Sequence, residues 1–140
     1  LWPACGEIPG AAMEKVNDRA GDCGISLVFF MPDAASALEV AAALDAEGVR
    51  CGTVFSKQFP DRHIYYHWDY VMEKRSAHRN GAPWSLEREP RRVDYTKDMC
   101  PRTIGLLERA VMLPVTQSMS DPYVGQVVDA IRKVARNWRG

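Results

Sequence analysis

The chain has 140 residues, which is enough for one domain with a hydrophobic core and too few for two. Its 18 Lys and Arg residues balance its 18 Asp and Glu residues, so the formal net charge is zero. A neutral chain has no long-range field that attracts nucleic acid or an anionic membrane surface, and we expect neither as a partner. The shares of hydrophobic residues, 46%, and charged residues, 26%, are typical of an ordinary soluble globular domain.

Several features bear on the cellular compartment. The longest apolar run, residues 25–31, is too short to cross a bilayer, and no secretory signal is visible. The four cysteines lie far apart and form no C-x-x-C pair, so we expect reduced, partly buried thiols in a cytoplasmic protein. The chain opens at Leu1 without a Met, and we therefore expect it to be a piece of a longer protein.

The first predicted elements are an irregular entry and a buried strand. Residues 1–24 are rich in Gly, Pro and Ala, and we expect at most one short strand or helical turn there, around residues 11–16. The β-branched and aromatic residues 25–30 predict a buried strand.

A helix and a second strand are predicted to follow at once. Asp33 is placed to cap a helix over residues 34–47, and Gly48 to end it in a left-handed conformation. The apolar stripe of this helix consists of Ala37, Leu38, Ala41 and Leu44. Residues 49–55 then predict a second strand, so that the clearest local signal is a strand–helix–strand unit.

The segment over residues 56–99 differs from its surroundings because it is polar and aromatic and contains several helix breakers. A short helix over residues 68–75 is compatible with the pattern, and the rest predicts a long loop. Loops of this length are uncommon inside a domain and tend to carry function, so a site is expected in this segment.

Regular structure is predicted again after Cys100. Pro101 suits the first position of a helix that reaches about Arg109, and residues 111–115 predict a short strand in which Pro114 marks an edge or an end. Asp121 opens the last helix, which is amphipathic. Its apolar stripe consists of Val124, Val127, Val128, Ile131, Val134, Ala135 and Trp138.

This order of elements predicts an α/β fold of the two-layer α+β kind. We expect a small, mainly antiparallel sheet with helices packed on one face. The whole chain, residues 1–140, is assigned to a single domain, with residues 56–99 as a long aromatic and polar loop region inside it. The fold by itself does not identify a function.

Residues 62–70 concentrate aromatic side chains that also form hydrogen bonds. Such rings stack on the C–H faces of a polyhydroxylated ligand while polar groups bind its hydroxyls at the rim. The alternative is that Ile64, Tyr66 and Trp68 anchor the loop to the core. The sequence leaves both interpretations open.

Other kinds of site are weakly supported. His63 and His67 have the sequence spacing of half a metal site. Neither Cys51 nor His78 stands at a diagnostic sequence spacing from this pair as a further ligand, and we expect no metal. No glycine-rich phosphate loop is present. The basic runs at residues 88–92 and 132–136 are interpreted as solvated surface.

Four stretches, taken in order, resemble the C-terminal part of the DegT/DnrJ/EryC1/StrS sugar aminotransferases. Residues 43–50 are similar to that family's helix-to-strand junction, and the aromatic stretch with His63 stands where the family has a loop reaching toward the substrate. Residues 100–115 and residues 119–138 are similar to its last strand and final helix. Gln117 and Ser118 depart from the family, many members of which have His-Pro there.

The resemblance implies the small C-terminal domain of a fold-type-I aminotransferase that depends on pyridoxal phosphate (PLP) and transfers an amino group to a keto-sugar of the nucleotide-sugar or sugar-acid type. In that family PLP is bound mainly by a larger N-terminal domain, which carries the Schiff-base lysine, and the intact enzyme is expected to be a homodimer. None of the lysines here lies in the family's S-x-x-K setting, so the isolated chain is expected to be inactive. The substrate contacts implied for this chain, none of them catalytic, are Phe55, His63, Tyr65, Tyr66 and Trp68.

Two other functions remain open on the sequence. The chain can be a stand-alone α/β module that binds a small polar ligand or a partner without catalysis. It can also be an interaction subunit that completes a site on a separate large chain.

Overall fold

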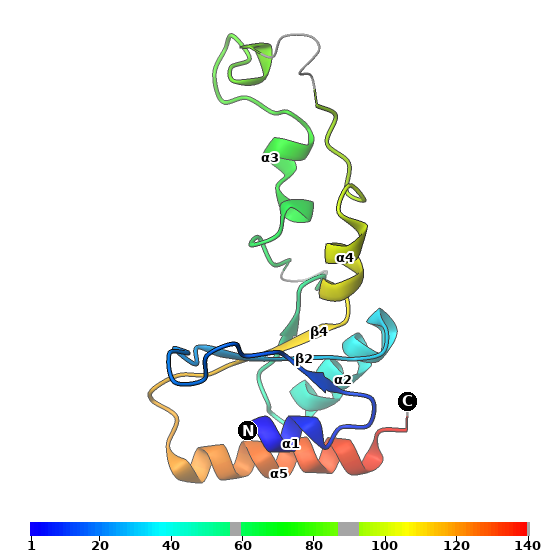
Figure 1. Ribbon diagram of the computed structural model, residues 1–140, viewed down its shortest axis with the longest axis vertical. Coiled ribbons are helices and arrows are strands. Elements are labelled where there is room, and N and C mark those ends of the chain that lie inside the picture. The colour runs from blue at the N-terminus through cyan, green and yellow to red at the C-terminus, as the bar shows by residue number, and fades with distance from the viewer. Residues whose placement is uncertain (57–59, 87–92, 140) are drawn as a thin grey trace. The chain divides into compact units, whose positions relative to one another are not determined.

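The computed structural model describes residues 1–56, 60–86 and 93–139. The chain separates into two units, one formed by Leu1–Val54 with Gly105–Gly140 and the other by Phe55–Ile104 (Figure 1). The first unit holds the sheet and the helices that pack on it. The second unit includes the whole of the predicted loop region, residues 56–99, and the assignment of the whole chain to one domain stays a prediction.

The sheet of the first unit has four strands in the order β1-β2-β4-β3. These strands are β1 (Ala12–Met13), β2 (Ser26–Phe30), β4 (Ala110–Pro114) and β3 (Gly52–Thr53), and each neighbouring pair is antiparallel. Strand β4 lies between β2 and β3, which are joined through helix α2 (Ala34–Ala46). This is a βαβ unit split by an inserted strand, and it confirms the predicted small antiparallel sheet.

Three helices cover one face of this sheet and confirm the predicted two layers. Helix α1 (Trp2–Gly6) contacts β1, β2 and α5 (Asp121–Asn137), while α2 contacts β4 and α5. Figure 1 shows α1 and α5 together on the same side of the sheet. The predicted stripe of the last helix is correct in its centre, because Val127, Ile131 and Val134 are all buried.

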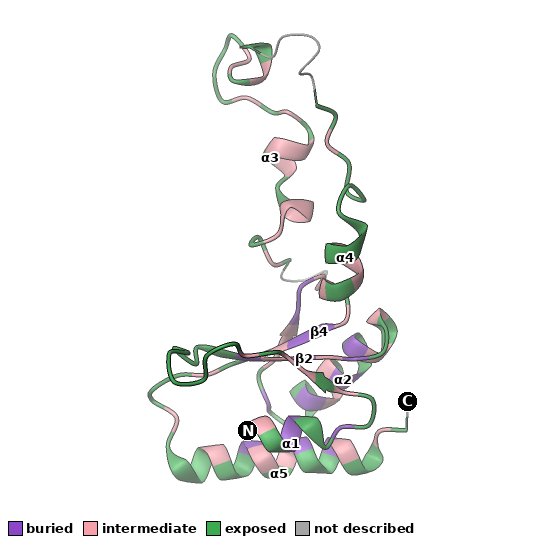
Figure 2. Cartoon of the chain, in the orientation of Figure 1, coloured by how far each residue is buried: buried purple, intermediate pink, exposed green. Residues whose placement is uncertain are grey.

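The core forms where alternate residues of the two central strands meet these helices. Leu27 pairs with Leu113, and Phe29 pairs with Val111, and all four side chains are buried. The residues between them, Val28 and Met112, are only partly buried, as expected for the opposite face of a strand with period two. Figure 2 shows the buried residues concentrated on the central strands and their helices.

Both ends of α2 form as the sequence indicates. The Asp33 carboxylate accepts a hydrogen bond of 2.8 Å from the Ser36 backbone N–H, and this bond is the largest cause of a lowered pKa for the Asp33 carboxyl. At the other end Gly48 has φ +79°, and the Val49 N–H donates to the Leu44 carbonyl. These contacts form a Schellman cap, which turns the chain sharply toward β3.

The two glycines Gly48 and Gly125 predict opposite effects of replacement by alanine. A Cβ would meet no atom within 4 Å at either position, so only the backbone decides the outcome. G48A is expected to lower the free energy of unfolding by about 1–2 kcal/mol, because an L side chain is strained at positive φ. G125A, inside helix α5, is expected to raise it by up to about 1 kcal/mol. Urea titrations of both variants check these signs, and equal signs would contradict this description of the helix cap.

Two predictions for the first unit are wrong, one about a helix face and one about the length of a strand. Leu38 is predicted in the buried stripe of α2 but is 52% exposed, because the buried face instead follows Ala37, Val40 and Leu44 at spacings of three and four. The strand predicted over residues 49–55 is limited to Gly52–Thr53. It pairs with only two residues at one edge of β4, and the chain turns at Val54 and Phe55.

The helix predicted inside the loop region and the helix predicted directly after it are both shorter than expected. Helix α3 (Asp69–Met72) replaces the helix predicted over residues 68–75. It ends early because Lys74 has φ +48° and the Arg75 N–H donates to the Tyr70 carbonyl, which is again a Schellman cap. Helix α4 (Pro101–Leu107) begins at Pro101 as predicted and ends before Arg109.

Candidate functional site

The second unit contains no buried residue among those that the structure describes in it. Figure 2 shows α3 and its neighbours only in the colours of intermediate and exposed residues. Its large apolar side chains with high exposed fractions are Trp68 at 45%, Tyr70 at 66%, Leu86 at 72%, Val93 at 49% and Met99 at 43%. The described residues of this unit therefore form no hydrophobic core of their own, and side-chain contacts hold these residues together.

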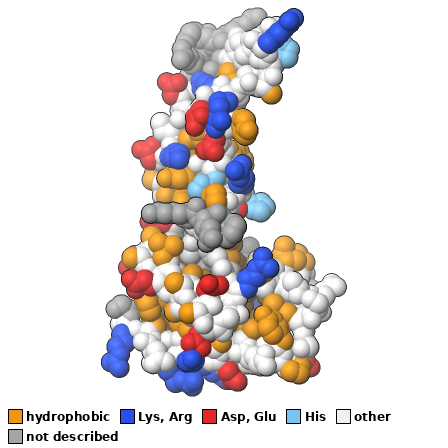
Figure 3. Space-filling view, turned by 180° about the vertical axis from the view of Figure 1, so that it is seen from behind, with side chains coloured by type: hydrophobic (Ala, Val, Ile, Leu, Met, Phe, Trp, Pro, Cys, Tyr) orange, Lys and Arg blue, Asp and Glu red, His pale blue; other side chains and the backbone are white. Residues whose placement is uncertain are grey.

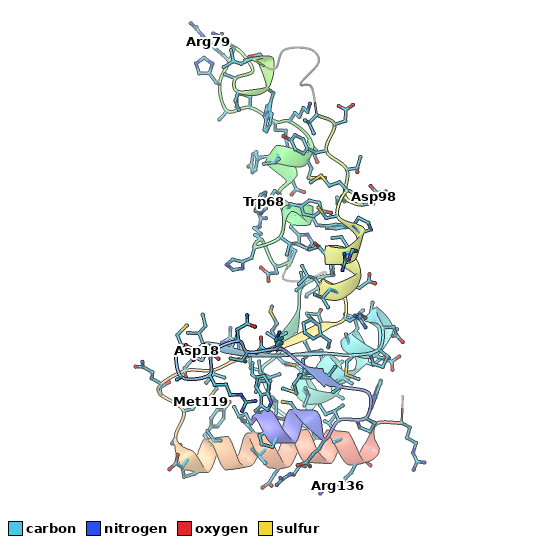
Figure 4. The ribbon with its side chains drawn as sticks, in the orientation of Figure 1. Asp18, Trp68, Arg79, Asp98, Met119 and Arg136 are labelled. Atoms are coloured by element: carbon cyan, nitrogen blue, oxygen red, sulfur yellow. The ribbon has the colours of Figure 1, made fainter. Side chains whose placement is uncertain are left out.

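Near its base, these contacts join an outgoing limb, residues 60–86, to a returning limb, residues 93–104. The Tyr65 hydroxyl donates a hydrogen bond of 2.7 Å to the Lys97 carbonyl and accepts one of 3.2 Å from the Cys100 N–H. The Lys97 ammonium lies 4.6 Å from the centre of the Tyr66 ring. Figure 4 shows the two limbs with Trp68 on one and Asp98 on the other.

Farther out, tryptophan and tyrosine rings join the same limbs. The rings of Trp84 and Tyr95 meet edge to face at 6.1 Å, and the Trp84 indole N–H donates to the Arg75 carbonyl. The Lys74 ammonium lies 3.9 Å from an Asp94 carboxylate oxygen and 5.7 Å from the centre of the Tyr95 ring. These side-chain contacts hold the two limbs side by side, and the limbs are not paired as β-strands in the part that the structure describes.

Three rings form an aromatic cluster at the start of the unit. Phe55 and Tyr66 meet edge to face with ring centres 5.0 Å apart, and His67 lies 5.6 Å from Phe55 and 5.1 Å from Tyr66. All three side chains are partly buried. Each ring is fixed by its neighbours and still leaves surface for another molecule, which is the arrangement that a binding wall requires.

A second group lies at the beginning of the outgoing limb. The Asp61 carboxylate accepts hydrogen bonds from the His63 backbone N–H at 2.8 Å and from the His63 ring at 2.6 Å. The Trp68 indole N–H donates to the Arg62 carbonyl at 2.7 Å, which fixes the turn that carries this pair. The imidazole of His63 is 96% exposed, whereas the Asp61 side chain is only 19% exposed.

The structure brings together two of the five predicted contacts, Phe55 and Tyr66, in the aromatic cluster. Tyr65 joins the two limbs through its hydroxyl, while His63 and Trp68 lie outside the cluster and are exposed. His67 completes the cluster and was not predicted as a contact. The only sequence signal for this role of His67 is its position in the aromatic segment. The sequence spacing of nearby residues does not show that the His67 ring contacts the ring of Phe55.

The alternative in which Ile64, Tyr66 and Trp68 anchor the loop to the core stays a prediction. Ile64 and Tyr66 are partly buried, and Trp68 is exposed.

No protein-family model matches the chain.

The described residues do not form a PLP site. Such a site needs an accessible lysine beside a phosphate cradle and a partner for the pyridine nitrogen. Instead Lys97 lies over Tyr66, Lys74 contacts Asp94, and Lys133 is paired with Glu47 at 2.7 Å. Lys15 is exposed, and Lys57 lies outside the described residues.

The cysteines and possible metal ligands were the other groups that the sequence offered for chemistry. All four cysteines are free. Burial raises the pKa of the Cys5 and Cys51 thiols to about 11, so both are protonated at neutral pH. Within residues 1–56, 60–86 and 93–139 no three His, Cys, Asp or Glu side chains gather as metal ligands.

The surface charges are mixed in sign. Arg132, in the basic run of the last helix, binds the Glu7 carboxylate through Nε and a terminal nitrogen at 3.0–3.1 Å. Both signs of charge also occur along the face shown in Figure 3. Among the helices in the part of the chain that the structure describes, none combines the length and the apolar character needed to cross a membrane.

Among the clefts of the first unit, which were not predicted, one combines two kinds of lining. It has a volume of about 250 Å³ and combines apolar with hydroxyl-bearing side chains. Its lining includes Val49, Arg50, Leu113, Thr116, Ser118 and Tyr123. No residue of the aromatic segment contributes to it.

Proposed function

We propose that this chain is the substrate-closing C-terminal part of a PLP-dependent aminotransferase that acts on a keto-sugar. The observation that carries the proposal is the aromatic cluster of Phe55, Tyr66 and His67. Its rings are held against one another and yet remain partly exposed, in a unit whose described residues include no buried side chain. Rings fixed in this way suit a wall that closes over a ligand better than they suit a core.

The chemistry of the cluster fits a polyhydroxylated ligand. Ring faces accept the C–H groups of a sugar, while the Tyr66 hydroxyl offers a hydrogen bond at the edge of the same surface. Lys97 lies over the Tyr66 ring and holds it from the returning limb. This chain's own contribution is therefore to bind and orient the sugar and to exclude water from it.

The amino-transfer chemistry is assigned to PLP bound elsewhere. On the resemblance to the DegT/DnrJ/EryC1/StrS aminotransferases, we propose that the Schiff-base lysine lies on a larger N-terminal domain of the same enzyme. Within the described residues, Lys74 and Lys133 each contact a carboxylate and Lys97 lies over an aromatic ring. In the intact homodimer, some of the rings named above are proposed to reach the partner subunit's site.

Reductive trapping tests where the lysine lies. When the 140-residue chain is mixed with PLP and reduced with borohydride, we expect no stoichiometric phosphopyridoxyl-lysine, as checked by intact mass and by peptide mapping. The longer enzyme that contains this chain should instead give one adduct per subunit, on a lysine outside these residues.

A single lysine of this chain that is labelled stoichiometrically would show a cofactor site here and contradict the proposal. If the longer protein takes up no PLP at all, the stand-alone binding module becomes the better description of the chain.

A further inference from the structure

Asp61 and His63 form a hydrogen-bonded pair. Stacking of aromatic rings on a sugar does not need such a pair, so the pair calls for a separate explanation. The distance from Nδ1 of His63 to Oδ1 of Asp61 is 2.6 Å, and the same oxygen also accepts the His63 backbone N–H. The carboxylate is thus held by two donors from one residue. Its own side chain is mostly covered, while the imidazole beyond it is almost completely exposed.

The hydrogen bond decides which ring nitrogen carries the proton. Burial by itself raises the pKa of the Asp61 carboxyl. The hydrogen bonds from the backbone and the ring of His63, with a further contribution from the charge of His67, outweigh this effect of burial, and the pKa of the Asp61 carboxyl is lowered. An ionised carboxylate can only accept hydrogen bonds, so Nδ1 is the protonated nitrogen. The lone pair of a neutral His63 is then on Nε2, on the side of the ring that faces away from Asp61.

We propose that Asp61 is a positioning residue, which fixes the Nδ1–H tautomer of His63 and presents its Nε2 to a hydroxyl of the bound ligand. The hydroxyl donates its hydrogen bond to the Nε2 lone pair. When the proton moves to Nε2, the positive charge of the imidazolium is balanced by the Asp61 carboxylate, and the same proton returns from Nε2 to the ligand oxygen. Asp61 itself takes up no proton in this exchange.

The proposed function identifies the ligand as a sugar, and to that extent the inference rests on it. The arrangement of the pair is independent of PLP and can be tested on this chain alone. His78 serves as an internal control, because it lies in the same unit, is also exposed and has the opposite hydrogen bond: its Nδ1 accepts the Asn80 N–H at 3.2 Å. A neutral His78 therefore carries its proton on Nε2.

The first measurement is a two-bond ¹H–¹⁵N spectrum of the histidine rings, in buffer alkaline enough for imidazoles to be neutral. We expect the Nδ1–H pattern for His63 and the Nε2–H pattern for His78. In D61N the turn is kept, because the amide oxygen can still accept the His63 backbone N–H, but the charge is lost. His63 should then show a weaker preference, because a neutral amide oxygen accepts the Nδ1–H less strongly than a carboxylate, while the His78 signals stay in place. An Nε2–H pattern for His63 in the unchanged chain would overturn the proposal, and so would a His63 pattern that D61N leaves unaltered.

The second measurement is the rate of acylation by diethyl pyrocarbonate, followed for each histidine by peptide mapping in the same alkaline buffer. The Nε2 lone pair attacks one carbonyl carbon, ethyl carbonate leaves as carbon dioxide and ethanol, and the ring loses its Nδ1 proton. We expect His63 to react faster than His78, and D61N to slow His63 by at least about threefold, as the loss of a charge-assisted hydrogen bond implies. Equal rates for the two histidines, or a His63 rate unchanged in D61N, would contradict the role of Asp61.

The intact enzyme supplies the functional measurement. D61N and H63Q should lower kcat/KM for its keto substrate by similar factors, while H78Q should not. A normal D61N enzyme beside an impaired H63Q enzyme would show that His63 works without Asp61. The first two measurements use neither PLP nor sugar. They can therefore contradict the role of Asp61 while the aminotransferase proposal stands, and they can support the role of Asp61 if the aminotransferase proposal fails.

Discussion

F29A is expected to lower the free energy of unfolding by about 3–5 kcal/mol, the largest effect of any single substitution considered for this chain. Phe29 is fully buried in the central strand β2, and it pairs with Val111 of β4 beneath the helices. Truncation removes the burial of the ring and leaves a cavity that the packed strands cannot close. Urea unfolding, followed by circular dichroism, measures the loss.

F30A supplies the matched control, because Phe30 is the next residue of the same strand and points to the opposite face. Its side chain is only partly buried, so we expect a clearly smaller loss than for F29A. Similar losses for the two variants would contradict the two-layer arrangement, in which only one face of the sheet is covered by α1, α2 and α5.

Y66A is expected to lower kcat/KM of the intact enzyme by roughly thirtyfold, which corresponds to about 2 kcal/mol. The Tyr66 ring is in contact with Phe55 and His67, and it lies beneath the ammonium group of Lys97. Its removal takes away a wall of the proposed pocket and frees two neighbouring rings. The unfolding of the first unit should not change, because Tyr66 does not belong to its core.

Two further variants separate the role of the ring from other effects. Y66F keeps the ring contacts and should retain most of the activity that Y66A loses. Y70A removes an equally large side chain that is 66% exposed and contacts Arg75, outside the aromatic cluster, and should leave kcat/KM nearly unchanged. If Y70A reduced activity as much as Y66A, the whole outgoing limb rather than the cluster would be responsible.

The first unit could be predicted well where the pattern is local. The apolar run before Met31 and the spacing of Val127, Ile131 and Val134 each indicate their element directly, because burial repeats with the period of that element. The cap at Gly48 is likewise local. The prediction made strand β3 too long. The length of this two-residue edge strand is determined by its pairing with β4, and β4 is more than fifty residues away in the sequence, so no local pattern shows where the pairing ends.

The site was predictable only as a segment. The density of aromatic residues drew attention to residues 62–70, but it could not show that the Tyr65 hydroxyl would bind the backbone at Lys97 and Cys100, more than thirty residues further on. It also could not tell Tyr66, which enters the cluster, from Trp68, which does not. Contacts of this kind depend on how two irregular limbs pair, and no periodicity records that pairing.

The most direct measurement is photocrosslinking from position 66 in the intact enzyme. Tyr66 is replaced by a benzophenone amino acid, PLP is fixed on its lysine by borohydride, and the crosslinked peptides are identified by mass spectrometry, with the same replacement at Tyr70 as the control. The account predicts that position 66 crosslinks to the segment carrying the phosphopyridoxyl-lysine, on the same or the partner subunit, and that position 70 does not. Crosslinks from position 66 confined to residues of its own unit, such as Phe55, would contradict the claim that these rings form a wall of the reaction pocket.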